Sequence, residues 1–162
     1  MSQLLTDKQR ELIERLGVFH EQHGMPPAEA RILSLLIISD ATELTFDQIR
    51  ELLNISKSAT STALNMLMLT QKVTYTTRPG DRKRYFASNI VNWEENASAG
   101  FKKMLGVNKL LKEILDQRTP HTPEFNEALR NFIEFLEYMN AELPQLFEKW
   151  RNRRHNHDEP LK

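Results

Sequence analysis

The chain has 162 residues, of which 40% are hydrophobic and 27% are charged, and its mean hydropathy is -0.55. No apolar run approaches the roughly 18 residues of a membrane-spanning helix, and the first residues lack the continuous apolar core of a signal peptide. Because the chain contains no cysteine, a disulfide framework, a thiolate metal site and a cysteine nucleophile are all excluded. We therefore expect a cytoplasmic protein without a membrane partner, built as one compact domain or as a small domain with helical extensions.

The formal net charge is +0, but the charge is unevenly distributed along the chain. Residues 41–88 carry seven basic and four acidic side chains, whereas the segments before and after them are slightly acidic. Within this block, the stretch 72–84 holds five basic residues and a single acid, Asp81. Phosphate binding responds to such a local field and not to the total charge. A neutral total therefore leaves a nucleic-acid partner open.

The first two predicted helices form the beginning of a core. Thr6 and Gln9 have the spacing of a capping box and open a helix over 6–23, which Gly24 ends. A second helix, near 28–39, is apolar almost all round, which is typical of a helix buried in the centre of a domain. The first helix is expected to turn one apolar stripe toward it, formed by Leu12, Ile13, Leu16 and Phe19.

The next two helices are close together and differ in length. Thr45 and Gln48 form a second capping box, which opens a short helix over 46–53. After a tight connection, Ser56 is expected to cap a longer helix over 57–71. At helical spacing, the inner face of this longer helix consists of Thr60, Ala63, Leu64 and Leu67.

A β-hairpin is predicted directly after the second helix of this pair. Residues 72–77 are β-formers, the Arg-Pro-Gly-Asp sequence at 78–81 is a turn, and 82–87 reads as the return strand. Most of the basic residues of the chain's middle block lie at this turn and at the start of the return strand.

The last third is predicted to be helical again. One helix is expected over 94–117, and a final helix begins after a rigid break, with Thr122 as its cap and Pro123 in its first turn. Pro144 is expected to kink or divide that final helix. Its apolar residues step by three and four, as in a packed helical seam, and we expect a dimer interface there: Phe125, Leu129, Phe132, Leu136, Met139, Leu143, Leu146 and Trp150.

The predicted elements combine into a fold that is mainly α with a small β-hairpin wing, a winged helix-turn-helix with dimerisation helices at both ends. The expected domains are a DNA-binding domain over 1–90, a helical dimerisation region over 91–155, and a disordered tail over 156–162.

The second helix of the pair must enter a major groove about 12 Å wide, so short polar side chains suit its outer face. The basic wing would contact the DNA backbone or the minor groove. Alternation along the return strand favours Arg82 and Arg84 over Lys83. The candidate DNA-binding residues are Lys57, Ser58, Ser61, Thr62 and Asn65 in the helix and Arg78, Arg82, Lys83 and Arg84 in the wing.

The sequence also resembles a known family over residues 24–88. The stretch from MPPAEARILSLLIISD through LTFDQIRELLNISKSATSTALNMLM to RPGDRKRYF is similar to MarR-type regulators, especially their GbsR-like branch. The resemblance implies a prokaryotic homodimeric transcriptional regulator, usually a repressor, whose terminal helices build the dimer interface. It implies DNA contacts at Ser58, Ser61, Thr62, Asn65 and Arg82. It also suggests an effector pocket for a small molecule of unassigned identity.

A second hypothesis is a winged-helix module that dimerises and binds protein without touching DNA. It is motivated by the neutral total charge and by the predicted recognition helix, on which Lys57 is the single basic residue before Lys72. The polar helix face and the basic hairpin tip would then be ordinary solvated surfaces. Binding to random duplex DNA at low salt separates the two hypotheses.

Nothing in the sequence indicates catalysis or a cofactor. It contains no phosphate loop, no nucleophile motif and no paired carboxylates in a cleft context, so we expect neither an enzyme nor a cofactor-binding protein. His20 and His23 have a spacing at which they could share a metal ion, but no third ligand stands near them. We therefore expect these histidines to be surface or core residues.

Overall fold

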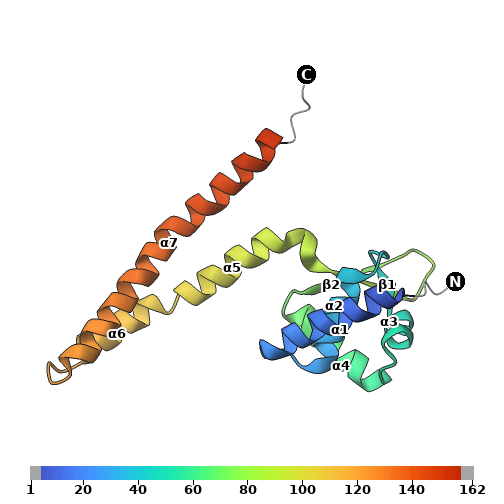
Figure 1. The fold of residues 1–162 in the computed structure, drawn as a ribbon, viewed down its shortest axis with the longest axis horizontal. Helices are drawn as coiled ribbons and strands as arrows, with labels where there is room; N and C mark the ends of the chain where they lie inside the picture. Colours follow the sequence, from blue (N-terminus) through green and yellow to red (C-terminus); the bar gives the residue numbers. More distant parts are fainter. Residues whose placement is uncertain (1–4, 158–162) are drawn as a thin grey trace. The chain divides into compact units, whose positions relative to one another are not determined.

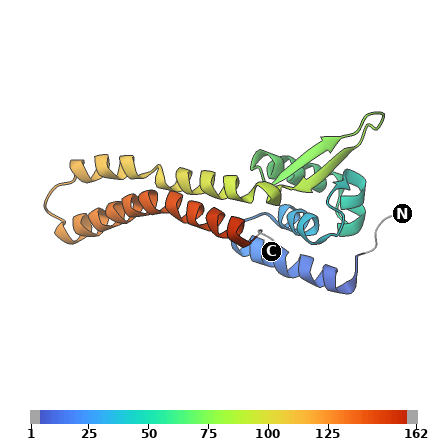
Figure 2. The ribbon, with the colours of Figure 1, turned by 90° about the horizontal axis from the view of Figure 1, so that it is seen from above.

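The computed structural model describes residues 5–157 and divides the chain into two units, Met1–Trp93 and Glu94–Lys162. Figures 1 and 2 show the first unit as a group of short helices with a small sheet and the second as a long helical hairpin. The predicted fold class, mainly α with a small β wing, is confirmed. None of the helices within residues 5–157 is both long and apolar enough to cross a lipid bilayer.

The first unit has the predicted order of elements. The capping boxes at Thr6 and Thr45 are both present, and the Ser56 side chain accepts a hydrogen bond from the backbone of Ala59. In chain order the elements are α1 (Asp7–Gln22), α2 (Pro27–Ile38), β1 (Leu44–Thr45), α3 (Phe46–Leu53), α4 (Lys57–Leu69), β2 (Val73–Thr77), β3 (Arg84–Ser88) and the 3-10 helix η1 (Asn89–Asn92).

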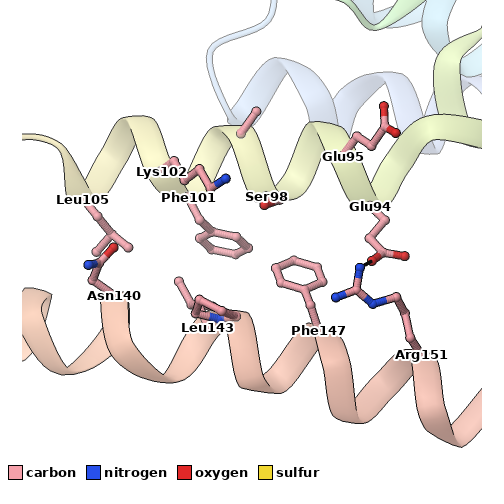
Figure 3. A pocket seen from close by; sticks show the side chains of 12 residues that line it. Glu94, Glu95, Ser98, Phe101, Lys102, Leu105, Asn140, Leu143, Phe147 and Arg151 are labelled. Carbon is pink, nitrogen blue, oxygen red and sulfur yellow. Dashed lines mark ion pairs between the residues drawn. The ribbon is translucent and has the colours of Figure 1, made fainter.

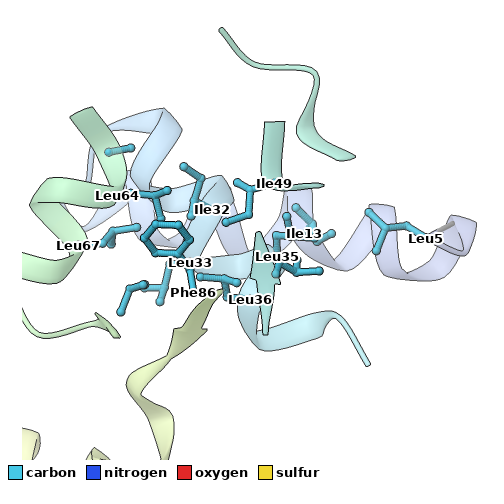
Figure 4. Close-up of a cluster of buried hydrophobic side chains, with 13 residues drawn as sticks. Leu5, Ile13, Ile32, Leu33, Leu35, Leu36, Ile49, Leu64, Leu67 and Phe86 are labelled. Carbon is cyan, nitrogen blue, oxygen red and sulfur yellow. The ribbon is translucent and has the colours of Figure 1, made fainter. Parts of the chain in front are cut away.

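The core of this unit is built around α2, as its apolar sequence predicts. Figure 4 shows side chains from α1, α3, α4 and β3 gathered around those of α2. The hydroxyl of Ser34, the one polar side chain buried in this helix, donates to the carbonyl of Ala30 at 2.8 Å, so its burial leaves no unpaired donor. The buried residues of α2 are Ala30, Ile32, Leu33, Ser34, Leu35 and Leu36.

The apolar stripe predicted for α1 is wrong in part. Ile13 is buried and Leu16 is half-buried, but Leu12 and Phe19 are 37% and 54% exposed. The centre of the face that α1 turns to α2 therefore lies at Ile13 and Gly17, and part of the expected core stripe faces outward.

Gly17 explains why α1 meets α2 on this face. A Cβ atom at this position would collide with the guanidinium of Arg31, which extends from α2 across α1. There Arg31 pairs with Glu14, at 2.9 Å, and with Glu21. Arg31 thus joins the two helices by a polar crossing, and a side chain at position 17 would force this arginine to shift.

The wing is a three-stranded antiparallel sheet in the order β1-β3-β2, so the predicted hairpin is confirmed and gains a third strand. Phe86 of β3 lies at its centre, opposite Leu44 of β1 on one side and Tyr75 of β2 on the other. At the tip, Gly80 has a φ of +80°, as the third residue of a type II turn with proline second requires.

The return strand begins at Arg84, later than the predicted 82–87. The Asp81 carboxylate accepts a hydrogen bond from the backbone N–H of Lys83 at 2.9 Å, and this local bond keeps residues 81–83 out of the sheet. Because Arg82 and Lys83 precede the strand, the alternation argument that favoured Arg82 over Lys83 does not apply.

The second unit consists of α5 (Trp93–Leu105), α6 (Asn108–Gln117) and α7 (Pro123–His157). The single helix expected over 94–117 is wrong, because the chain breaks between α5 and α6 at Gly106 and Val107. Glycine inside a helix costs about 1 kcal/mol relative to alanine, and a β-branched residue follows it here. Figures 1 and 2 both show α6 running beside α7.

The final helix is longer than predicted and continues through Pro144, so the expected division at that residue is wrong. It reaches His157, and residues 156 and 157, expected in the disordered tail, are helical. The rest of that predicted tail, 158–162, lies outside the described residues.

The apolar stripe of α7 is shared between two surroundings. Leu136 and Leu143 are buried against Leu105, with Leu111 and Met139 packed beside them. The ring centroids of Phe101 on α5 and Phe147 on α7 lie 6.3 Å apart (Figure 3). Both rings line a hollow of about 470 Å³ between the two helices. The exposed apolar residues of α7 are Phe125, Phe132, Phe135, Tyr138 and Leu146, at 56%, 49%, 54%, 63% and 63%.

Candidate nucleic-acid interface

The two faces of α4 differ as the sequence predicts. Its inner residues Thr60, Ala63, Leu64 and Leu67 are buried, and the Thr60 hydroxyl donates to the Ser56 carbonyl at 2.9 Å. Lys57, Ser58, Ser61, Thr62 and Asn65 are exposed, as are Met66 and Leu69 in the last two turns of the helix. All five residues predicted to contact DNA from this helix therefore lie on its accessible side.

The position of α4 relative to α3 is set by a tight corner. Asn54 ends α3 in the left-handed conformation, with a φ of 52°, and its backbone N–H donates to the Arg50 carbonyl. The N–H of Ile55 donates to the same carbonyl at 3.2 Å, and the Ile55 side chain packs against the core. Asparagine tolerates this conformation better than most residues do. The corner joins the two helices over a connection of three residues, 54–56.

A groove lies between α4 and the wing. It has a volume of about 300 Å³ and brings Ser61 and Asn65 of α4 together with the basic residues 82–84. Its floor is apolar and includes Leu64 and Phe86. Five of the nine candidate residues are thus assembled at one place by two elements that are separate in the sequence.

Two other candidates on α4 lie beside a different element. Ser58 and Thr62 line a shallow hollow with Pro26, Ala28 and Glu29, at the start of α2. A phosphate that approached this part of α4 would meet the carboxylate of Glu29 and no cation of the hollow, whereas the groove beside the wing presents three cations against one carboxylate, that of Asp47. The wing side of α4 is therefore the more favourable place for an anion.

Arg82 and Lys83 are the most available cations of the wing. Both side chains are exposed, and within residues 5–157 neither is held in an ion pair or a side-chain hydrogen bond. Arg84, by contrast, lies over the ring of Tyr75, with its guanidinium carbon 4.6 Å from the ring centroid. The stacking orients the Arg84 side chain, and the N–H groups in the plane of its guanidinium can still donate hydrogen bonds to a ligand.

Arg78 is not brought to the groove. It follows β2 and contacts Tyr85, which by the sheet register lies on the face opposite to that of Arg84 and Phe86. It donates to the carboxylate of Glu43 at 3.1 Å and lies 3.8 Å from the ring centroid of Tyr85. No local sequence pattern marks Glu43 for this contact, because Arg78 lies 35 residues further along the chain.

The turn of the wing carries a negative charge of its own. The Tyr85 hydroxyl donates to Asp81 at 2.7 Å, and this bond, together with the backbone N–H of Lys83, lowers the pKa of Asp81. The same hydrogen bond raises the pKa of Tyr85. Asp81 is therefore ionised and Tyr85 is neutral near pH 7, so one fixed carboxylate partly offsets the basic residues around it.

The histidine pair on α1 is not assembled into a metal site. Burial lowers the pKa of His20, and the proximity of His23 lowers it further. The Nδ1 atom of His23 lies 2.7 Å from the Phe19 carbonyl. Within the described part of the chain, no three His, Cys, Asp or Glu side chains are grouped so that they could hold a metal ion.

Comparisons with known proteins agree with this geometry. A sequence profile of the MarR family matches residues 23–84, which is less than half of the chain but includes all nine candidate DNA-binding residues. A crystal structure of a transcriptional regulator matches 90% of this chain and 99% of its own, with a TM-score of 0.70 and 19% sequence identity. At that identity the likeness shows a common fold. No curated protein matches the chain.

Proposed function

We propose that this protein is a DNA-binding transcriptional regulator of MarR type, which grips duplex DNA with α4 and the wing. The observation that carries the proposal is the groove in which Ser61 and Asn65 stand beside the basic residues 82–84. Short polar side chains allow a helix to enter the major groove, and adjacent cations on a hairpin can neutralise the flanking phosphates. The match to the MarR family covers this same part of the chain. The proposal assigns no catalytic step to the protein.

The two elements would contribute differently to binding. Serine and threonine hydroxyls discriminate poorly between bases, and α4 carries no arginine that could read a guanine. The side chains of Arg82 and Lys83 are exposed and form no ion pair or hydrogen bond within residues 5–157. We therefore expect affinity to come mainly from backbone contacts of the wing, and selectivity to depend strongly on DNA shape.

A homodimer is part of the proposal. Exposed aromatic and aliphatic side chains on α1 and α7, among them Phe19, Phe132 and Leu146, are suited to contact a second copy of the chain. Two copies of α4 in successive major grooves would read a pseudo-palindrome with half-sites about 10–10.5 bp apart. The resemblance to MarR-type regulators, and within them to the GbsR-like branch, favours repression, action in the cytoplasm and control by a small-molecule effector.

Replacing Arg82 by alanine is expected to weaken binding to any duplex sequence. If this side chain neutralises one phosphate, the slope of log K against log salt should become shallower by about one unit. The measurement is a fluorescence-anisotropy titration of a labelled random duplex at several salt concentrations. Arg10→Ala is a matched control, because Arg10 is an exposed arginine on α1 that no acidic side chain within residues 5–157 pairs with.

Two outcomes would contradict the proposal at different levels. Unchanged affinity and slope for Arg82→Ala would show that the wing does not grip the backbone through this residue. A wild-type protein that does not associate with duplex at low salt would remove the regulator proposal and favour the winged-helix protein-interaction module.

A further inference from the structure

One basic residue of the wing is held by an acid on the far side of β3. Glu43, directly before β1, accepts a hydrogen bond from the Thr76 hydroxyl with one carboxylate oxygen and from the Arg78 guanidinium with the other, both at 3.1 Å. The guanidinium also stacks on Tyr85 at 3.8 Å, and Tyr85 is fixed by its hydrogen bond to Asp81. We call the ion pair between Glu43 and Arg78 the Glu43–Arg78 clamp.

The clamp sets Arg78 apart from the other cations of the wing. The Arg82 and Lys83 side chains are exposed and form no ion pair within residues 5–157, although the charge of Asp81 acts on Lys83, and the Arg84 side chain stacks on Tyr75. Arg78 is 58% exposed but its charge is already compensated by Glu43, which is 29% exposed. A phosphate that binds Arg78 must displace this carboxylate or accept its repulsion, because both anions use the donors of the same guanidinium.

We propose that Glu43 withholds Arg78 from DNA and thereby lowers the affinity of the wing for duplex. The inference rests on the proposed DNA-binding function and adds a residue that limits it. Removal of the Glu43 charge would release one more phosphate-binding cation. Exposed ion pairs contribute little to folding, so this release should leave the sheet intact. Glutamine at position 43 keeps the size of the side chain and an oxygen that can accept from Thr76.

The test is a double-mutant cycle in the full-length protein with Glu43→Gln, Arg78→Ala and their combination. Binding to a labelled random duplex is measured over a series of salt concentrations. We expect Glu43→Gln to bind about threefold to tenfold more tightly at low salt and to steepen the salt slope by about one unit. Arg78→Ala alone is expected to stay within about twofold of the wild type, since the clamped arginine contributes little. In the double variant the gain should disappear.

A matched control separates this effect from the loss of any negative charge. Glu51→Gln makes the same substitution at an exposed glutamate of α3 that pairs with no cation within residues 5–157. It is expected to change affinity by less than about twofold. Thermal unfolding of each variant, followed by circular dichroism, checks that the fold is retained.

The results distinguish a failure of the proposed role of Glu43 from a failure of the DNA-binding proposal. Equal or weaker binding by Glu43→Gln, while wild-type binding still depends on Arg82, overturns the role of Glu43 and leaves the regulator proposal standing. A gain that persists when Arg78 is alanine also overturns it, because Glu43 would then act by general repulsion. If the wild-type protein does not bind duplex, the proposed function fails and the inference fails with it.

Discussion

Phe132→Glu is expected to dissociate the proposed homodimer and to weaken its binding to a two-half-site operator by about a hundredfold or more, the usual scale of lost bivalency. Phe132 is 49% exposed on α7, and Phe135 and Leu146 on the same helix are 54% and 63% exposed. An ionised carboxylate at the centre of an apolar interface must be desolvated without a partner, which a marginal interface does not tolerate. The residues that hold the second unit together, Leu105 and Leu136, are untouched by the substitution.

The oligomeric state would be measured by sedimentation velocity, in parallel with the DNA titration. Ala141→Glu is the matched control, because it adds the same charge to the same helix. Position 141 is exposed and lies about two and a half helical turns from Phe132, so its side chain points to the opposite side. Should Phe132→Glu remain a dimer, the interface does not use this face of α7, and Phe19 of α1 becomes the next position to test.

Ile32→Ala is expected to cost the winged unit about 2–5 kcal/mol of unfolding free energy, a large share of the stability of a small domain. The Ile32 side chain is 0% exposed and belongs to the cluster that joins α2 to α1, α3, α4 and β3. Loss of its methyl groups removes buried apolar area and leaves a cavity that the surrounding helices cannot close completely. DNA binding should fall with the folded fraction, since the orientation of α4 depends on this core.

The same helix provides the control. Ile37 also lies on α2 but is 42% exposed, so Ile37→Ala should cost less than about 1 kcal/mol. Urea unfolding followed by far-ultraviolet circular dichroism would give both values. Equal losses for the two substitutions would contradict the assignment of Ile32 to the centre of the core.

Much of the winged unit could be predicted from the sequence because its signals are local. The hydroxyls of Thr6 and Thr45 cap helices through residues three positions away, and a turn of Pro79 and Gly80 closes the hairpin. The buried and exposed faces of α4 follow from helical spacing alone. Such features need only neighbours along the chain, so periodicity and capping rules identify them.

What could not be predicted depends on contacts between distant residues. The strand β1 has two residues, and its partner Phe86 lies 42 positions after Leu44, so no local pattern indicates the pairing. The ion pair between Glu43 and Arg78 likewise joins residues that are far apart in the sequence. The hydrogen bond from Lys83 to Asp81 is local, but it competes with strand formation, and only the structure decides which prevails.

The apolar stripes illustrate a different limit. A regular spacing of apolar residues on α7 indicates that a helix face will be covered, but does not say by what. In the structure Leu136 and Leu143 are covered within the second unit, whereas Phe132 and Leu146, on the same predicted seam, are not. On α1 the crossing of Arg31 over Gly17 moved the buried face away from Leu12 and Phe19.

The separation of the two faces of α4 has a consequence for how such a protein could change over time. Within residues 5–157, Ser61, Thr62 and Asn65 make no side-chain hydrogen bond to the rest of the chain, while Thr60, Leu64 and Leu67 on the inner face of the same helix are buried in the fold. Exposed substitutions of this kind usually alter stability by about 0.5 kcal/mol or less. Mutations at the three outward positions can therefore accumulate almost freely with respect to folding, and a duplicated copy could acquire a new operator while keeping its scaffold unchanged.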